Sequence, residues 1–222
     1  MKILLVDDHP VIRDGMALLI AHSFPGHQVM QAGSLAEAQA CLRREAGITL
    51  VLLDLGLPDS KGVETIEALH ELGINARIVV MSANNDAQTI LAAIDAGASG
   101  YVPKSAETTV MLSALRVVID GGVYLPPPAL MSTEPTEFDS TLQEAQDLEQ
   151  LGLSPRQVDV LRSLIQGKPN KLICRDLGLS DSTVKTHLAA IFRKLGVNSR
   201  TQAVVAAARL GLRFEVSASV AR

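Results

Sequence analysis

The 222-residue sequence contains no tryptophan, only two cysteines and few aromatic residues. Cys41 and Cys174 lie far apart in the chain, without the close spacing of a zinc site or the cysteine density of a disulfide framework. Aromatic residues make up 3% of the chain, so it has few rings on which the bases of RNA or single-stranded DNA would stack. These absences argue against a disulfide-rich protein, a zinc-ribbon protein and a binder of unpaired bases.

Long apolar segments and targeting signals are missing as well. No segment approaches the roughly 18 consecutive apolar residues that cross a bilayer. The chain begins directly with a strand-like run, MKILLVDD, which lacks the pattern of a signal peptide. Hydrophobic residues make up 47% of the chain, enough for a buried core. We therefore expect a cytoplasmic protein without a membrane partner.

Charge is distributed unevenly along the chain. Residues 1–150 contain 8 Lys and Arg against 20 Asp and Glu, a net charge of −12. Residues 151–222 contain 12 Lys and Arg against 4 Asp and Glu, a net charge of +8. The overall charge of −4 therefore conceals two parts of opposite sign. Such asymmetry predicts two domains with different partners, the basic one facing phosphates.

Strand-like apolar runs alternate with amphipathic helical stretches over the first 120 residues. The runs lie at residues 3–6, 29–32, 50–53, 77–81 and 100–102. The helical stretches lie near residues 10–23, 34–45, 62–73, 85–96 and 106–120. This alternation predicts an α/β fold, a flavodoxin-like doubly wound (βα)5 domain over residues 1–121, with a parallel sheet covered on both faces.

Residues 122–150 differ in composition and are interpreted as a linker. They are rich in proline and glycine and then acidic, and the three prolines at 126–128 favour an extended spacer. A short acidic helix over residues 139–150 is compatible with the sequence. The linker separates the first domain from a second domain over residues 151–222.

The second domain is predicted to be small and all-α, with four helices. Ser154, Pro155 and Gln157 form the start signal of a helix, with a capping box. Helices over residues 169–177 and 181–195 are separated by Gly-Leu-Ser, with Ser180 placed to cap the second of them. Two helices joined by such a short turn are typical of a helix-turn-helix.

Polar side chains with related chemistry follow the predicted strands of the first domain. They are Asp7 and Asp8 after the first strand, Asp54 at the end of the third, Ser82 at the end of the fourth and Lys104 after the fifth. Binding sites in open parallel sheets lie beyond the carboxyl ends of the strands, and the strand order 2-1-3-4-5 makes the first and third strands neighbours. We therefore expect three carboxylates to meet in one crevice, whereas Asp59 and Asp86 are interpreted as turn or capping residues.

Three adjacent carboxylates repel one another unless a cation lies between them, and Mg²⁺ prefers such oxygen ligands. We expect them to hold Mg²⁺, with the backbone carbonyl of Gly56 as a further ligand. Asp54 is then the candidate nucleophile toward a phosphoryl group. Lys104 would neutralise the transferred group, and the hydroxyl of Ser82 would donate a hydrogen bond to it.

Four segments, LLVDDHP, VLLDLGLPDSKG, VVMSA and GYVPK, resemble the landmark segments of response-regulator receiver domains, in the same order. The resemblance covers essentially residues 1–121. It implies that Asp54 is the phosphoacceptor, that Asp7 and Asp8 help to hold Mg²⁺, and that Lys104 contacts the phosphoryl oxygens. No landmark residue is missing, so nothing indicates a receiver that cannot be phosphorylated.

The same resemblance implies a switch in the receiver domain. Ser82 takes the place of the family's switch hydroxyl, and Tyr101 matches the aromatic residue that turns inward on activation. The alternative for Tyr101 is a plain strand residue of an amphipathic strand.

Residues 151–208 resemble the four-helix DNA-binding domain of the LuxR/NarL/FixJ family. The resemblance rests mainly on Ser-x-x-Thr-Val-Lys-x-His, followed by Lys-Leu-Gly-Val and Arg-Thr-Gln-Ala. Gln157 stands where the family often has Glu, and it still supports the capping box. The resemblance implies that double-stranded promoter DNA is the partner, and that the Ala/Val-rich helix near residues 200–210 forms a homodimer contact. Packing of that helix against its own domain remains the alternative.

The hydrophobic period of the helix over residues 181–195 predicts which of its faces is free. Its inward stripe consists of Val184, Leu188, Ile191 and Leu195. Lys185, Thr186, Ala189, Ala190 and Arg193 therefore point outward. Lys185 is the best candidate for a contact to bases, and Thr186 offers a methyl group to thymine. The candidates for phosphate contacts are Thr183, His187, Asn170, Lys171, Arg193 and Arg200.

Together these patterns predict a two-component response regulator rather than an enzyme. A sensor histidine kinase would phosphorylate Asp54, and phosphorylation would control sequence-specific DNA binding and transcription, with RNA polymerase as a further candidate partner. One alternative is a phosphotransferase or phosphatase, but the chain lacks the second Asp that such hydrolases place two residues after the nucleophile. Another alternative is a DNA-binding regulator independent of phosphorylation, with the receiver domain as an interaction module.

Overall fold

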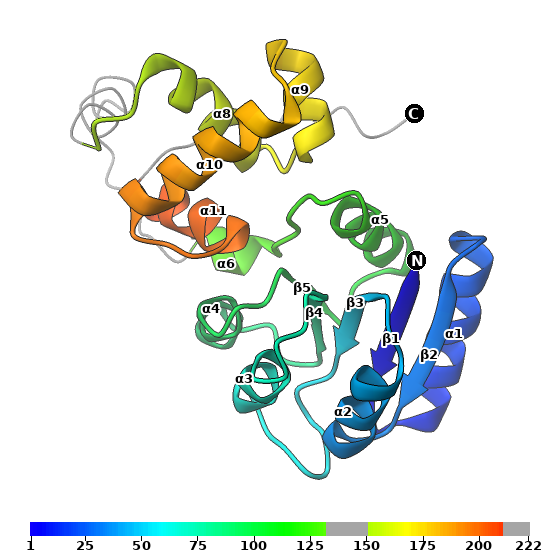
Figure 1. Ribbon diagram of the computed structural model, residues 1–222. Coiled ribbons are helices and arrows are strands. Elements are labelled where there is room, and N and C mark those ends of the chain that lie inside the picture. The colour runs from blue at the N-terminus through cyan, green and yellow to red at the C-terminus, as the bar shows by residue number, and fades with distance from the viewer. Residues whose placement is uncertain (132–150, 211–222) are drawn as a thin grey trace. The chain divides into compact units, whose positions relative to one another are not determined.

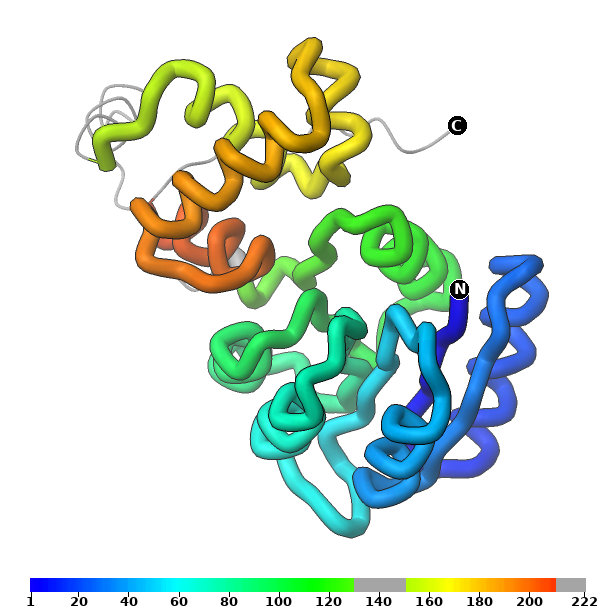
Figure 2. The backbone as a smooth tube through the Cα atoms, viewed as in Figure 1, coloured from blue at the N-terminus to red at the C-terminus, as the bar shows by residue number. Residues whose placement is uncertain are grey.

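The computed structural model describes residues 1–131 and 151–210. They belong to two compact units, whose backbones are traced in Figures 1 and 2. Among the described residues, the strands belong to the first unit, and the helices from Pro155 to Arg209 belong to the second. In the parts of the chain that the structure describes, no helix is both long and apolar enough to cross a membrane.

A five-stranded parallel sheet with the order β2-β1-β3-β4-β5 forms the centre of the first unit. Its strands are β1 (Lys2–Val6), β2 (Gln28–Ala32), β3 (Ile48–Leu53), β4 (Arg77–Ser82) and β5 (Gly100–Pro103). The last four residues of β1 and of β3 are completely buried, as expected for a parallel sheet covered on both faces. The predicted doubly wound order is confirmed.

Four helices connect these strands, a fifth follows β5, and together they cover the sheet. They are α1 (Pro10–Ser23), α2 (Leu35–Arg44), α3 (Glu64–His70), α4 (Ala87–Asp95) and α5 (Thr108–Ile119). Figure 1 shows α1 and α5 on one face of the sheet and α2, α3 and α4 on the other. Asp86 caps α4, because its carboxylate accepts a hydrogen bond from the N–H of Thr89. The interpretation of Asp86 as a capping residue is therefore confirmed.

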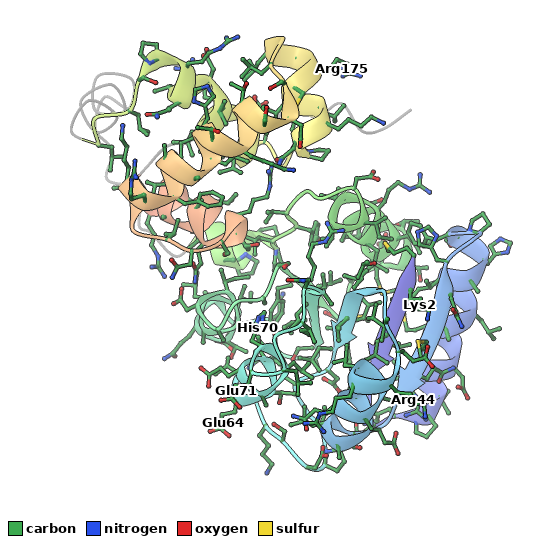
Figure 3. The ribbon with its side chains drawn as sticks, viewed as in Figure 1. Lys2, Arg44, Glu64, His70, Glu71 and Arg175 are labelled. Carbon is green, nitrogen blue, oxygen red and sulfur yellow. The ribbon has the colours of Figure 1, made fainter. Side chains whose placement is uncertain are left out.

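The C-terminal end of α2 is tied to the first strand by charged side chains. Glu45 forms ion pairs with Lys2, at 3.0 Å, and with Arg44, at 3.7 Å; Figure 3 labels both basic residues. The hydrogen bond from Lys2 lowers the pKa of Glu45. Because Arg44 is exposed and Lys2 and Glu45 are only half-buried, we expect these pairs to contribute little to the stability of the fold.

Asp59 caps a helix that lies far from it in the sequence. From the loop after β3, its two carboxylate oxygens accept hydrogen bonds from the N–H groups of Leu35, at 2.8 Å, and Ala36, at 2.9 Å. These are among the N–H groups that the first turn of α2 leaves without a helical partner. Asp59 is therefore a capping residue, as predicted, and it fastens the β3–α3 loop to α2.

We expect Asp59→Ala to lower the free energy of unfolding by about 1 kcal/mol or less, the lower range for a lost cap, because the carboxylate is exposed. Hydrogen bonds from the two N–H groups lower the pKa of Asp59. Its stabilisation is therefore complete above the unfolded pKa of about 4 and is lost as the pH falls through the lower folded pKa. Denaturant unfolding at about pH 7 and about pH 3 measures this difference, with Asp14→Ala as an exposed control. An equal loss for Asp59→Ala at both pH values would contradict the prediction.

The segment predicted to be a linker contains regular structure at its beginning. Helix α6 (Pro127–Met131) starts within the three prolines, and the N–H of Tyr101 donates to the carbonyl of Tyr124 at 3.2 Å. The prediction of an extended spacer is therefore wrong for this part. Proline is accepted in the first turn of a helix, because the N–H that it lacks would have no helical partner there. The predicted acidic helix over residues 139–150 lies outside the described residues.

The second unit contains α8 (Pro155–Ile165), α9 (Asn170–Leu177), α10 (Asp181–Leu195) and α11 (Arg200–Arg209). Ser154 and Gln157 form both hydrogen bonds of the predicted capping box. Helix α9 ends at Gly178, whose φ of +63° lies in the left-handed region that favours glycine. Ser180 then caps α10 by accepting the N–H of Thr183. The predicted helix-turn-helix is therefore confirmed as α9 and α10.

Candidate functional site

The register of the sheet places Asp7 and Asp54 side by side. Val6 pairs with Leu53 across β1 and β3, and the N–H of Asp54 donates to the carbonyl of Val6 at 2.9 Å. Each aspartate directly follows one of these paired residues. Although carboxylates prefer water, Asp7 is only 2% exposed and Asp54 only 6%. Burial of two adjacent carboxylates requires compensating positive charge or hydrogen bonds.

Lys104 provides part of this compensation. Its Nζ lies 2.7 Å from Oδ2 of Asp7 and 2.7 Å from Oδ2 of Asp54. Burial by itself lowers the pKa of Lys104, but the hydrogen bonds and charges of Asp54 and Asp7 outweigh it and raise that pKa above its usual value. One ammonium group thus bridges two buried carboxylates, and it remains charged at neutral pH.

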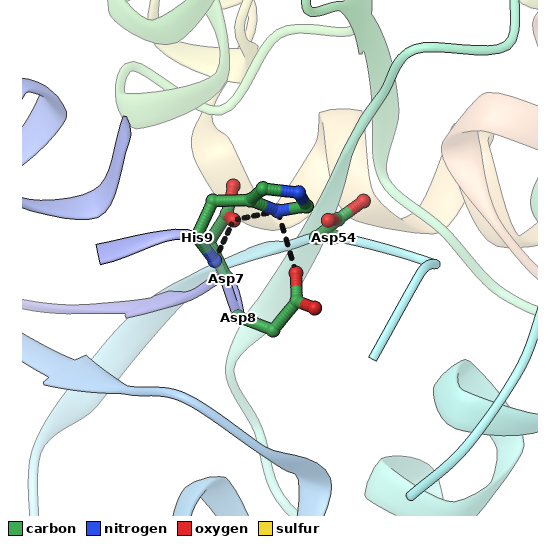
Figure 4. Close-up of side chains that lie close together, drawn as sticks. All are labelled: Asp7, Asp8, His9 and Asp54. Atoms are coloured by element: carbon green, nitrogen blue, oxygen red, sulfur yellow. Dashed lines mark hydrogen bonds and ion pairs between the residues drawn. The ribbon is translucent and has the colours of Figure 1, made fainter. Parts of the chain in front are cut away.

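Asp8 adds a third carboxylate to the cluster. Figure 4 shows the side chains of Asp7, Asp8, His9 and Asp54 close together. Each offers a ligand atom, and these atoms all lie within 4.8 Å of one another. Oδ1 of Asp8 is buried, and Nδ1 of His9 lies 2.6 Å from it. A single ammonium group cannot neutralise three carboxylates. The oxygen-rich donor set and the uncompensated negative charge therefore fit Mg²⁺.

Ser82 and Tyr101 meet at the loop after β4. The hydroxyl oxygen of Ser82 accepts a hydrogen bond from the N–H of Asn84 at 3.2 Å. The hydroxyl of Tyr101 donates to the carbonyl of Asn84 at 2.6 Å, and its ring is completely buried. Burial raises the pKa of Tyr101 above its usual value. The ring of Tyr101 therefore points inward, and Asn84 joins the two predicted switch residues.

Gly56 lies beside the carboxylate of Asp54. Its N–H donates to Oδ1 of Asp54 at 3.3 Å, and a Cβ at this position would lie 3.7 Å from Oδ2. That distance is an ordinary contact, so a side chain here would narrow the approach to Asp54 without a clash. The use of the Gly56 carbonyl as a metal ligand stays a prediction.

The predicted faces of α10 are confirmed for most of its residues. Val184, Leu188 and Ile191 are buried, and Leu195 is half-buried. The exposed residues include Lys185, Thr186, Ala189 and Arg193, whereas Ala190 is half-buried. The N-terminal half of the outward face therefore carries one basic side chain, and short side chains occupy most of the rest.

Polar side chains near the start of α10 are engaged within the helix. Lys185 forms an ion pair with Asp181 at 2.7 Å, and the hydrogen bond that it donates to Asp181 raises the pKa of Lys185. The hydroxyl of Thr186 donates to the carbonyl of Ser182 at 3.0 Å, although the residue is exposed. The hydroxyl of Thr183 lies 2.7 Å from that of Ser180, in the cap of the helix.

Two of the candidate phosphate contacts bind each other. Nη1 of Arg200 donates to Oδ1 of Asn170 at 3.0 Å, and Nη2 donates to the carbonyl of Lys168. Arg200 thus joins the start of α11 to the start of α9. Lys171 is exposed, as Arg193 is, and His187 is half-buried. Contacts of all these residues to DNA stay predictions.

Helix α11 contacts α8 and α10 within the second unit. Its buried residues are Thr201, Ala203, Val204, Val205 and Ala207. This packing agrees with the alternative interpretation of its small residues, a contact to its own domain. The homodimer contact of this helix stays a prediction.

The sequence interpretation missed several residues of both sites. His9 directly follows the aspartate pair, so its position in the sequence was a usable signal. The pairing of Asp181 with Lys185 follows from their spacing of four residues in a helix, and it was likewise predictable. The contact of Asn84 with Tyr101 joins the loop after β4 to β5, and no local sequence pattern indicates it.

The fold and the acidic site define a receiver-like domain joined to a helix-turn-helix domain, and comparisons with known proteins agree. Residues 3–116 match the model of the response regulator receiver domain, and residues 151–207 match the model of bacterial regulatory proteins of the luxR family. The chain is 34% identical over 208 residues to the glycerol metabolism activator of Pseudomonas putida, with 93% of this chain and 94% of that protein covered. It is 35% identical over 206 residues to the nitrate/nitrite response regulator protein NarL of Escherichia coli strain K12, with 91% and 93% covered.

Solved structures show the same likeness. A two-component response regulator of the LuxR family from Aurantimonas sp. SI85-9A1 has a TM-score of 0.53 at 34% identity, over 58% of this chain and 91% of that chain. The RcsB response regulator of Salmonella typhimurium has a TM-score of 0.54 at 21% identity, over 92% and 96%, which supports the fold alone. The chain belongs to the response regulators that join a receiver domain to a LuxR-type DNA-binding domain.

Proposed function

We propose that a sensor histidine kinase phosphorylates Asp54 and that phosphorylation controls sequence-specific binding of this cytoplasmic regulator to double-stranded promoter DNA. The observation that carries this proposal is the buried Asp7, Asp54 and Lys104 cluster, in which one ammonium group contacts both carboxylates at 2.7 Å. A site of this kind presents a nucleophilic oxygen next to a cation that can receive a phosphoryl group. No turnover of a separate substrate is proposed.

The phosphoryl group would pass directly from a histidine of the kinase to Asp54. A carboxylate oxygen of Asp54 forms a bond to phosphorus while the phosphorus–nitrogen bond of the donor phosphohistidine breaks, and the imidazole keeps the electron pair and takes up a proton. Lys104 then pairs with an oxygen of the phosphoryl group. Asp7, Asp8 and Asp54 would hold Mg²⁺, which supplies further positive charge to the transferred group.

The phosphoryl group would act on the switch residues through charge and hydrogen bonding. It adds roughly −1.5 to −2 charges at neutral pH, by analogy with other phosphorylated side chains. The hydroxyl of Ser82, which here accepts the N–H of Asn84, becomes a donor to the new oxygens. Because Asn84 also accepts from Tyr101, movement of this loop would alter the surface formed by α4 and β5. That surface would favour homodimerisation, which presents two recognition helices to one operator, and RNA polymerase is a candidate partner of the DNA-bound dimer.

DNA affinity with and without phosphorylation tests the proposal. Operator DNA selected in vitro from a random pool would be titrated with the full chain, before and after treatment with Mg²⁺ and a small-molecule phosphodonor. A competent state populated at about 1% before phosphorylation permits a gain in affinity of up to about a hundredfold. We expect a gain of at least about tenfold for wild type and none for Asp54→Ala. Equal affinities before and after phosphorylation of the wild type would favour the regulator that is independent of phosphorylation.

Asp181→Asn is predicted to strengthen binding to DNA. The carboxylate of Asp181 pairs with Lys185 at 2.7 Å. It also places a negative charge on a surface that would face the phosphates of DNA. Its removal frees Lys185 and should raise affinity on the order of two- to fivefold at low salt, with a smaller gain at high salt. Asp159→Asn changes the net charge equally on α8, where Asp159 pairs with Arg156, and serves as the control. Weaker binding by Asp181→Asn would instead indicate that Asp181 itself contacts a base.

A further inference from the structure

We propose that His9 supplies a nitrogen ligand to the cation at the carboxylate cluster, so that this site binds Mn²⁺, Co²⁺ or Zn²⁺ more tightly than Mg²⁺. The inference deepens the proposed function, because it concerns the same cluster of Asp7, Asp8 and Asp54. His9 would add a nitrogen ligand, which the carboxylates cannot provide. An imidazole among the ligands changes which metal ions the site prefers.

The position of the imidazole supports direct ligation. Nδ1 of His9 lies 2.6 Å from Oδ1 of Asp8 and 3.2 Å from Oδ1 of Asp7, as Figure 4 shows. Two ligands at right angles on one metal ion, each bound at about 2.1 Å, lie about 3 Å apart. The distances from Nδ1 of His9 to the two carboxylate oxygens, 2.6 and 3.2 Å, are one shorter and one longer than this ligand separation. A small movement of the side chains would therefore place one ion against the imidazole and the carboxylates.

The backbone holds His9 in this orientation. Its N–H donates to Oδ1 of Asp7 at 2.8 Å. Pro10 begins α1, and the residue before a proline is restricted to extended conformations, which His9 adopts with φ −91° and ψ 103°. Although His9 occupies the N-cap position of α1, its side chain does not cap the helix. The imidazole is instead directed to the carboxylates.

The burial of the Asp8 oxygen beside the imidazole gives a further reason for a cation at this point. Oδ1 of Asp8 is buried, and its contact at 2.6 Å is with the imidazole alone, which is a weaker source of positive charge than a divalent ion. Its near neighbour Nδ1 of His9 belongs to a side chain that is 62% exposed, so an ion can reach both atoms from solvent. A divalent cation between them would bind the carboxylate oxygen and the lone pair of the imidazole together.

The ligand set then decides which ion is preferred. Mg²⁺ favours carboxylate and water oxygens and keeps several of its waters, whereas imidazole suits zinc and other transition metals. For a site of mixed nitrogen and oxygen ligands, affinity rises from Mn²⁺ through Co²⁺, and Zn²⁺ also binds well. The cluster with His9 is such a site. Without the imidazole it would be an oxygen site suited to Mg²⁺.

The test uses the full chain loaded with Mn²⁺ and pulsed electron paramagnetic resonance, which detects a directly bound ¹⁴N nucleus. We expect ¹⁴N coupling in the wild type and in His22→Asn, a control that alters an exposed histidine at the end of α1. We expect the coupling to be absent in His9→Asn. Calorimetric titration should show that His9→Asn weakens Zn²⁺ and Co²⁺ binding on the order of tenfold or more, with Mg²⁺ binding changed less than about threefold.

The outcomes separate this inference from the proposed function. Mn²⁺ that binds the wild type without ¹⁴N coupling would overturn the role of His9 and leave the carboxylate site intact. Coupling that persists in His9→Asn would overturn it as well, because another residue would be the ligand. Failure of any divalent ion to bind, or binding unaffected by Asp8→Asn, would overturn both the inference and the proposed metal site. Circular dichroism of each variant checks that the domains remain folded.

Discussion

Asp54→Asn is expected to abolish the phosphoryl adduct completely. The substitution keeps the size of the side chain but removes the nucleophilic carboxylate, and an amide oxygen is a far weaker nucleophile. The full chain would be incubated with Mg²⁺ and a small-molecule phosphodonor, and its intact mass would be measured. We expect one adduct on the wild type and none on Asp54→Asn.

Asp59→Asn is the matched control for this experiment. Asp59 lies in the loop that follows the same strand, but its carboxylate caps α2 at 2.8 and 2.9 Å instead of facing Lys104. The control should therefore accept one phosphoryl group, as the wild type does. An adduct on Asp54→Asn would assign the acceptor to another residue. No adduct on either the wild type or Asp59→Asn would favour regulation by partners or by abundance.

The arrangement around Asp54 explains why such a loss should be total. Asp7 is also buried and also contacts Lys104, so it is the nearest competing acceptor. Its Oδ1, however, accepts the N–H of His9 at 2.8 Å, and its Oδ2 contacts Lys104. Asp54 also contacts Lys104 through Oδ2, but its Oδ1 accepts a longer hydrogen bond, from the N–H of Gly56 at 3.3 Å. Oδ1 of Asp54 is therefore held less tightly than Oδ1 of Asp7, and this difference favours Asp54 as the acceptor.

The sheet was predictable from the sequence because burial on both faces imposes continuous apolar runs. In β3, the residues from Leu50 to Leu53 are fully buried, and this run stands out from its polar neighbours. The carboxyl ends of parallel strands lie along one edge, so the meeting of Asp7 with Asp54 followed from the strand order alone. Helix boundaries with local capping signals, such as Ser180 before α10, were predictable for the same reason.

Side-chain partners across loops were not predictable in this way. The carboxylate of Asp59 caps α2 from another loop, and the guanidinium group of Arg200 binds Asn170 from another helix. Each contact depends on the distance between elements that are separate in the sequence. The amino-acid types indicated a capping residue and a cation, but not their partners. For Arg200, the predicted phosphate contact must therefore compete with a bond inside the domain.

Lys185→Ala is expected to cause the largest loss among the residues of the second unit. Lys185 is exposed near the N-terminus of α10, the part of a recognition helix that meets base edges in the major groove. Ala189 follows one turn later on the same exposed face and brings no polar group, so few other side chains can read bases directly. We expect affinity for selected operator DNA to fall on the order of ten- to a hundredfold, with relaxed preference at one or two base pairs.

Two comparisons separate base reading by Lys185 from a general effect of charge. Arg193→Ala removes an equal charge farther along α10. It should weaken binding to all DNA sequences alike, and it should reduce the slope of log affinity against log salt concentration by about one. Lys61→Ala makes the same side-chain change on an exposed loop of the first unit and should leave affinity unchanged. Titrations at several salt concentrations, against operators substituted one base pair at a time, measure both properties. If Lys185→Ala weakens every operator equally, Lys185 binds phosphate, and specificity must come from the thymine contact of Thr186 or from the shape of the DNA.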